Sequence, residues 1–138
     1  MCISARLKRG RETTADNMFD LRGLKVYIDG TLGSRGAALL ENYADADHKG
    51  FMNRTTKQAL DPILRAALRK GIQVETHVIG DRAVRTLLDW YEEAFKAVPK
   101  SEWAVAEPRW RLEHAQVITP QDQERLVSLG MLVSMQPS

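Results

Sequence analysis

The feature that most constrains this chain is a regular alternation of short β-rich runs with amphipathic helical runs. Strands are predicted over residues 24–30, 72–79, 111–117 and 131–135. Helices are predicted over residues 57–70, from Asp81 to Pro99 and from Thr119 to Gly130. This order of elements is typical of βα units around a parallel sheet, so we predict an α/β fold.

Local signals mark the ends of the helices. Gly71 follows the first helical pattern and is expected to end it, because glycine adopts the left-handed conformation of a helix C-terminus. Asp81 is expected to be the N-cap of the second helix. Thr119 and Pro120 are typical of a cap followed by the first helical residue. Residues 37–40 are predicted to form a short helical turn.

Composition excludes several classes of protein. The chain has 20 Lys and Arg against 18 Asp and Glu, a net charge of +2, which argues against a nucleic-acid module held by a basic surface. No apolar run reaches the roughly 18 residues that a membrane span needs. The single Cys2 excludes an intramolecular disulfide and a multi-cysteine zinc site. We therefore expect a cytoplasmic protein with no membrane or nucleic-acid partner.

Three residues near the ends of predicted strands are candidates for binding a metal. His77 and His114 lie near the C-terminal ends of consecutive strands, where ligands collect in parallel α/β folds. Lys25 lies on the preceding strand and shares a face with Tyr27 and Asp29. If Lys25 loses its proton and condenses with CO2, the carbamate ligates as a carboxylate does. Two imidazoles and this lysine then form a metal-binding set.

The residues alone leave a second interpretation open. Both histidines can instead be hydrogen-bonded residues of the core, with Lys25 in a salt bridge to Asp29 or Glu75. Two histidines 37 residues apart define no metal motif by themselves.

A glycine-rich segment, residues 30–36, follows the first predicted strand. It suggests a phosphate-binding loop, but it matches neither GxxxxGK[ST] nor GxGxxG, and its glycines also suit a tight turn. A small phosphate-binding α/β domain is therefore a third interpretation. Arg35 of this segment is a candidate contact for a polar substrate. Residues 41–56 are expected to form a polar surface loop in which His48 has no functional role.

Four strings in chain order resemble a known family. They look like the motifs of strands 4 to 7 in the amidohydrolase superfamily, within its amidohydrolase-3 branch, which includes N-substituted formamide deformylases. The strings are residues 23–35, 77–83, 111–116 and 134–137. Residues 3–7 resemble the tail of strand 3.

The resemblance implies a metal-dependent hydrolase on a TIM-type (β/α)8 barrel. Residues 1–138 would form a single partial barrel domain, from the end of strand 3 through strand 7, with residues 1–22 left without an assigned element. Lys25 would be the carboxylated, metal-bridging lysine, and His77 and His114 would ligate the second metal. The cofactor would be one or two divalent ions, with zinc favoured. A metal-activated hydroxide would cleave carbon–nitrogen bonds in small-molecule amides or N-substituted formamides.

The chain also departs from the family pattern. Such enzymes take a His-x-His pair from strand 1 and an aspartate from strand 8, and the chain contains no His-x-His. We therefore expect an internal piece of a longer enzyme, inactive alone, with no catalytic residue assigned and the general-base Asp supplied by strand 8. The alternative is a non-catalytic half-barrel that binds metal weakly or assembles through its open edges.

Overall fold

The four predicted strands form one parallel sheet in the computed structural model, which describes residues 7–136. They are β3 (Gly23–Tyr27), β4 (Gln73–Val78), β5 (Arg111–His114) and β6 (Leu132–Ser134). Each strand pairs in parallel with the next one along the chain. Because parallel neighbours need a crossover connection, a helix must pass between each pair from one end of the sheet to the other.

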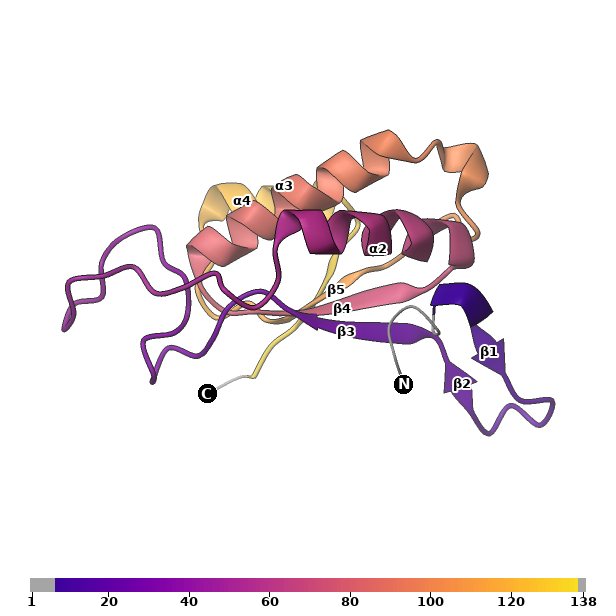
Figure 1. Cartoon of the computed structure of the whole chain (residues 1–138), viewed down its shortest axis with the longest axis horizontal. Coiled ribbons are helices and arrows are strands. Elements are labelled where there is room, and N and C mark those ends of the chain that lie inside the picture. The colour runs from indigo at the N-terminus through magenta and orange to yellow at the C-terminus, as the bar shows by residue number, and fades with distance from the viewer. Residues whose placement is uncertain (1–6, 137–138) are drawn as a thin grey trace.

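The three connecting helices all cover the same face of the sheet (Figure 1). They are α2 (Lys57–Lys70), α3 (Asp81–Ala97) and α4 (Pro120–Ser128). A doubly wound fold places helices on both faces, whereas a βα barrel places them all on the outer one. The predicted α/β fold with a parallel sheet is therefore confirmed, and its arrangement is compatible with part of a barrel.

Two helices have the ends that the sequence predicts. Thr56 caps α2, its side chain accepting a hydrogen bond from the Ala59 amide, and Gly71 ends the helix in the left-handed conformation at φ 63°. Pro62 lies inside α2 without ending it. At α4 the Thr119 side chain accepts from the amide of Asp122, and proline opens the helix.

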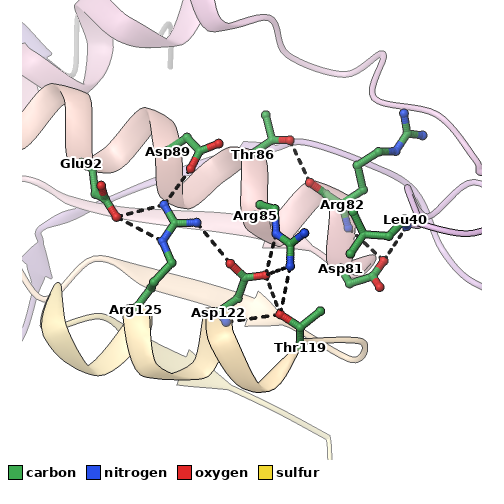
Figure 2. Close-up of polar contacts among 10 residues, drawn as sticks. All are labelled: Leu40, Asp81, Arg82, Arg85, Thr86, Asp89, Glu92, Thr119, Asp122 and Arg125. Carbon is green, nitrogen blue, oxygen red and sulfur yellow. Dashed lines mark hydrogen bonds and ion pairs between the residues drawn. The ribbon is translucent and has the colours of Figure 1, made fainter.

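The predicted cap of α3 is wrong by one residue. Gly80 is the N-cap, and Asp81 is the first helical residue. The Asp81 carboxylate instead accepts hydrogen bonds from the Leu40 and Arg82 amides, at 2.9 Å each (Figure 2). A side chain at position 80 would collide with the Ala38 carbonyl, since a Cβ there would lie 2.0 Å from that oxygen. This close approach requires glycine before the helix.

The short helical turn predicted over residues 37–40 is not formed, so that prediction is wrong. The Ala38 amide donates to Asp29, and the Ala38 carbonyl accepts from the Arg82 and Ala83 amides. These bonds hold the segment in an irregular loop against the start of α3, because they use the backbone groups that a helical turn would need.

The N-terminal part of the chain contains a hairpin that the sequence did not indicate. Strands β1 (Glu12–Thr13) and β2 (Asp20–Leu21) pair in antiparallel register and project from the body near the start of β3 (Figure 1). Of the strand expected over residues 3–7, residues 3–6 lie outside the described residues, and Leu7 lies in a helical segment with residues 8 and 9. A short 3₁₀ helix, η1 (Lys100–Glu102), follows α3. Within residues 7–136, no helix is both long and apolar enough to cross a bilayer.

The core lies between the sheet and the helices. Strand side chains alternate, so every second residue of β3 and β4 points to the helices while the residues between them point to the open face. Trp110 is fully buried against Tyr91 of α3, with ring centroids 4.8 Å apart, and the Tyr91 hydroxyl lies 2.6 Å from that of Thr76. The largest fully buried aliphatic side chains are Ile28, Leu60, Leu64, Leu68, Ile72, Val74, Val78, Leu87, Leu88 and Leu112.

A buried carboxylate joins α4 to α3 (Figure 2). Asp122 is 1% exposed and accepts hydrogen bonds from Thr119 at 2.7 Å, Arg85 at 3.1 Å and Arg125 at 3.1 Å. Arg125 also bonds to Asp89 on the exposed surface of α3. Burial raises the pKa of Asp122, but its hydrogen bonds outweigh burial, so the net pKa lies below the usual 3.8.

We expect Asp122→Asn to lower the free energy of unfolding by about 2 kcal/mol at pH 7, because it removes a paired, buried carboxylate. A depressed pKa stabilises the fold above the unfolded value of 3.8 and ceases to do so as pH falls through the lower folded value. The variant should therefore lose less stability on acidification, measured by urea unfolding at pH 7 and pH 3. Asp89→Asn, on the exposed side of the same network, should cost under about 1 kcal/mol. Equal losses of unfolding free energy in the two variants would contradict the stabilising role of the buried Asp122 carboxylate.

Candidate metal centre

Two predicted ligands come together at the C-terminal edge of the sheet. His77 is the penultimate residue of β4 and His114 is the last residue of the neighbouring strand β5, and Val78 is paired in register with His114. The two imidazole centroids are 4.8 Å apart, with the rings edge to face at 68°. When two imidazoles bind the same ion, each with a nitrogen about 2.0–2.1 Å from it, their ring centroids lie about 5 Å apart. The observed spacing therefore suits one shared ion.

The position of His114 depends on a break in the alternation of β5. Leu112 points to the helices and is fully buried, and a regular strand would point His114 the same way. Instead His114 and Ala115 both have positive φ, at 78° and 41°. This turns the imidazole toward His77 on the open face, while the Ala115 amide still bonds the Val78 carbonyl at 2.8 Å. Such conformations cost about 1–3 kcal/mol each in residues with a side chain, and they cluster at functional sites.

Hydrogen-bond acceptors occupy one nitrogen of each ring. Nε2 of His77 lies 3.5 Å from the Gly30 carbonyl and 4.0 Å from the Asp29 carboxylate. Nδ1 of His114 lies 2.7 Å from Oε1 of Gln136. Because an acceptor favours a proton on the ring nitrogen that it faces, this arrangement favours tautomers that leave Nδ1 of His77 and Nε2 of His114 available to a metal.

The surroundings of His77 favour its neutral form. Burial is the main cause that lowers its pKa below 6.5, and a hydrogen bond to the Gly30 carbonyl opposes this effect. A positive charge on His114 or Lys25 lowers the pKa of His77 further, and the Asp29 carboxylate raises it. Neutral imidazole is the form that ligates metals, so the shift favours metal binding.

Lys25 lies on the same open face, next to the histidines. Its Nζ is 5.3 Å from the Tyr27 ring centroid, and Tyr27 lies 5.2 Å from His77, centroid to centroid. The salt bridges that the second interpretation offered are not formed among residues 7–136. Glu75 instead pairs with Arg111 at 3.4 Å, and the Asp29 carboxylate is taken up by backbone amides.

The imidazoles of His77 and His114 are suitable donors for a divalent metal. Two nitrogen donors do not complete the coordination of such an ion, so further ligands are needed. Within residues 7–136, no group of three His, Cys, Asp or Glu side chains is placed to hold an ion. Lys25, as a carbamate, could add an oxygen ligand to an ion that His77 and His114 hold.

A cavity of about 710 Å³ opens beside His77. Its walls come from β3, the glycine-rich segment and the end of the long loop before α2. The residues that line it are Lys25, Val26, Tyr27, Asp29, Gly30, Thr31, Ser34, Gly36, Phe51, Asn53, Arg54, Thr55 and His77. The sequence reading missed Phe51, Asn53 and Arg54, because residues 41–56 have neither a motif nor a periodicity and were expected to form only a surface loop.

The structure does not bring Arg35 to this cavity. Its guanidinium makes two hydrogen bonds to Asp45, at 3.0 and 2.6 Å, so a role in substrate binding stays a prediction. The same segment does not form a phosphate cradle. The Gly30 amide donates to the Gly36 carbonyl and the Gly36 amide donates to Thr31, so these donors are used within the segment.

Comparisons with known proteins bear on the family and the fold of this chain. The sequence profile of the Amidohydrolase family (Amidohydro_3) matches residues 3–138. The chain is 33% identical to the protein LONG AFTER FAR-RED 3 of Arabidopsis thaliana over 131 residues, which is 95% of this chain. It is 32% identical to YtcJ of Bacillus subtilis over 114 residues, which is 83% of this chain. A metal-dependent hydrolase from Pyrococcus furiosus superposes with a TM-score of 0.77 at 29% identity, covering 95% of this chain.

The chain spans only part of these proteins. It covers 22% of the Arabidopsis protein, 20% of the Bacillus protein and 26% of the Pyrococcus chain. The resemblance that the four strings indicated is confirmed at the level of the family. With its profile matched over nearly the whole length, this chain belongs to the amidohydrolase family.

Proposed function

We propose that this chain forms the metal-binding part of a hydrolase that cleaves carbon–nitrogen bonds in non-peptide amides, such as N-substituted formamides. The observation that carries the proposal is the meeting of His77 and His114 at the C-terminal edge of a parallel sheet, with one nitrogen of each ring left available. Membership of the amidohydrolase family supports it. The formamide class rests on the resemblance of the four strings to N-substituted formamide deformylases.

The second part of the proposal is that the sheet belongs to a TIM-type barrel. Strand order β3-β4-β5-β6 and helices on one face support this, as does the match to about a quarter of the Pyrococcus hydrolase. A closed barrel has eight strands, so further strands would supply the remaining ligands and the aspartate that moves a proton. Hydrolysis would then need more of the barrel than these 138 residues.

In this proposal each residue of the site has a separate task. His77 through Nδ1 and His114 through Nε2 hold a divalent ion, zinc by preference, and Lys25 joins them as a carbamate. When bound, the ion polarises a carbonyl and lowers the pKa of water. Tyr27 and Phe51 offer apolar walls to the small-molecule amide, and Arg54 is a cation on the same cavity.

A second candidate, a non-catalytic assembly module, is favoured by apolar side chains near the β6 edge. Val133 and Met135 are 38% and 57% exposed, and Val127 of α4 is 81% exposed. The open face of the sheet carries charged pairs such as Arg111 with Glu113. Self-association, if it occurs, should therefore use the edge and not the face.

We expect the chain to bind one equivalent of Zn²⁺, measured by calorimetry at pH 7.5. Loss of a residue that hydrogen-bonds a metal ligand weakens metal binding roughly 10- to 100-fold. His77→Ala and His114→Ala each remove a ligand itself, so each should weaken Zn²⁺ binding by more than this. His48→Ala is the matched control, because the contacts of His48 are to Tyr43, Phe51 and the Gly50 amide and not to the paired imidazoles, so its loss should leave the affinity unchanged.

Hydrolysis is tested in a full-length relative, with formate and amine release from N-substituted formamides as the assay. Substitution at the positions aligned with His77 and His114 should lower kcat/KM at least about 1000-fold, because the ion no longer stabilises the transition state. Near-normal turnover in these variants would refute the proposed function.

We expect Lys25→Met to change the His77 titration in a direction that reports the state of Lys25. In CO2-free buffer the lysine is a cation that lowers the His77 pKa, so its removal should raise the midpoint seen by NMR. In bicarbonate buffer a carbamate would act in the opposite sense, and its removal should lower the midpoint. Lys49→Met is the control, because Lys49 bonds the Leu40 carbonyl in another loop. An unchanged His77 midpoint in both buffers would show that Lys25 does not act on His77 and would contradict its place in the site.

If the edge candidate is correct, light scattering after size-exclusion chromatography should show dimers or larger species at micromolar concentration. The double substitution Val133→Lys, Met135→Lys should return a monomer, because charged side chains block edge pairing. A monomeric wild-type chain over a 100-fold concentration range would exclude this candidate.

A further inference from the structure

Asp29 is a buried carboxylate within residues 23–35, and the sequence assigns it no role in the site. It lies two residues beyond the end of β3 and is 1% exposed. Its Oδ2 accepts the amides of Ala38 at 3.0 Å and Gly80 at 2.9 Å, and its Oδ1 accepts the amide of Ile79 at 3.0 Å. Three backbone donors, two of them beside the N-terminus of α3, therefore compensate the burial of this side chain.

The three amides belong to segments that surround His77. Ile79 and Gly80 form the turn from β4 into α3, directly after the histidine strand. Ala38 belongs to the loop that returns from the glycine-rich segment. One carboxylate thus joins the end of β3, the returning loop and the start of α3, and the position of His77 depends on all three.

The same carboxylate also faces the imidazole. Nε2 of His77 lies 4.0 Å from Oδ1 of Asp29 and 3.5 Å from the Gly30 carbonyl, and both of these groups are acceptors. An all-acceptor environment favours the proton on Nε2 and leaves Nδ1 unprotonated.

We infer that Asp29 is a positioning residue, which sets the orientation and the Nε2–H tautomer of His77 by fixing the turn from β4 into α3. This inference rests on the proposed role of His77 as a metal ligand. Asp29 acts through His77, because both of its own oxygens are already engaged by the backbone.

Asparagine cannot replace this carboxylate. Its side chain has the same shape but offers one acceptor oxygen and one NH2 group, so at least one of the three buried amides would face another donor. The turn must then shift, and Nδ1 of His77 moves with it. The test therefore uses Asp29→Asn in the 138-residue chain.

The matched control is Asp122→Asn. Asp122 is equally buried, at 1% exposure, but its partners Thr119 and Arg85 lie between α3 and α4 and not beside His77 (Figure 2). Both variants are compared with the wild type at a temperature at which circular dichroism shows each to be folded.

Two readouts are used, Zn²⁺ affinity by calorimetry and the His77 tautomer from long-range ¹H–¹⁵N NMR of the metal-free chain. Asp29→Asn should weaken Zn²⁺ binding roughly 10- to 100-fold and should mix the two tautomers, whereas Asp122→Asn should change neither readout more than about twofold. Unchanged affinity and tautomer in Asp29→Asn would overturn the inference.

If Asp29→Asn does not fold, the wild-type spectrum decides. An Nδ1–H tautomer of His77 overturns the inference, and an Nε2–H tautomer with hydrogen-bond couplings from the Ala38, Ile79 and Gly80 amides to the Asp29 carboxyl carbon supports it. A wild-type chain that binds no Zn²⁺ would instead contradict the proposed metal site in this chain, and the tautomer would still report on Asp29.

Discussion

Burial of one face of a parallel sheet is the constraint on which the rest of the structure depends. In β3 and β4, alternate residues such as Val26 and Val74 are buried beneath the helices, while Lys25 and Glu75 point the other way. Because side chains alternate, covering one face with α2 and α3 leaves the polar residues together on the other. Parallel pairing then brings the C-terminal ends of the strands to one edge, so the fold itself collects the residues of the site.

The alternation that builds the core must be broken to build the site. His77 reaches the open face by regular alternation, but His114 would be buried with Leu112 if β5 continued unchanged. The left-handed backbone at His114 and Ala115 reverses its direction. Bonds from the Ala115 amide to Val78 of β4, and from the Val117 amide to Ile79 directly after β4, hold the distorted segment in place. Strain in two residues is therefore accepted where it brings two imidazoles together, which is the pattern expected of a functional site.

Features with a local cause could be predicted from the sequence. The bounds of α2 follow from its apolar period and from Gly71, and the cap of α4 follows from Thr119, because each signal acts within a few residues. The N-cap of α3 was misplaced because Gly80 is required by contact with Ala38, which is 42 residues away in the chain (80 − 38).

Parts of the site were hidden for the same reason. Asp29 accepts hydrogen bonds from amides 9, 50 and 51 residues away, and no local sequence signal predicts these bonds. Arg54 and Phe51 reach the cavity from a loop without periodicity, and Arg35 is held by Asp45, ten residues further on. Strand ends and their histidines were predictable because parallel topology alone brings them to one edge. Long-range backbone contacts were not.

The electrostatics of the site impose a condition on Lys25. As a cation it lowers the pKa of His77, which keeps the imidazole neutral, but it also repels an incoming divalent ion. As a carbamate it would attract the ion and supply oxygen ligands, while its negative charge would make the imidazole easier to protonate. Burial, the largest influence on His77, lowers the pKa of the ring whatever the state of the lysine. The enclosure of His77 by β3 and the glycine-rich segment therefore favours the neutral imidazole that the proposed metal site needs, and this effect does not depend on the charge of Lys25.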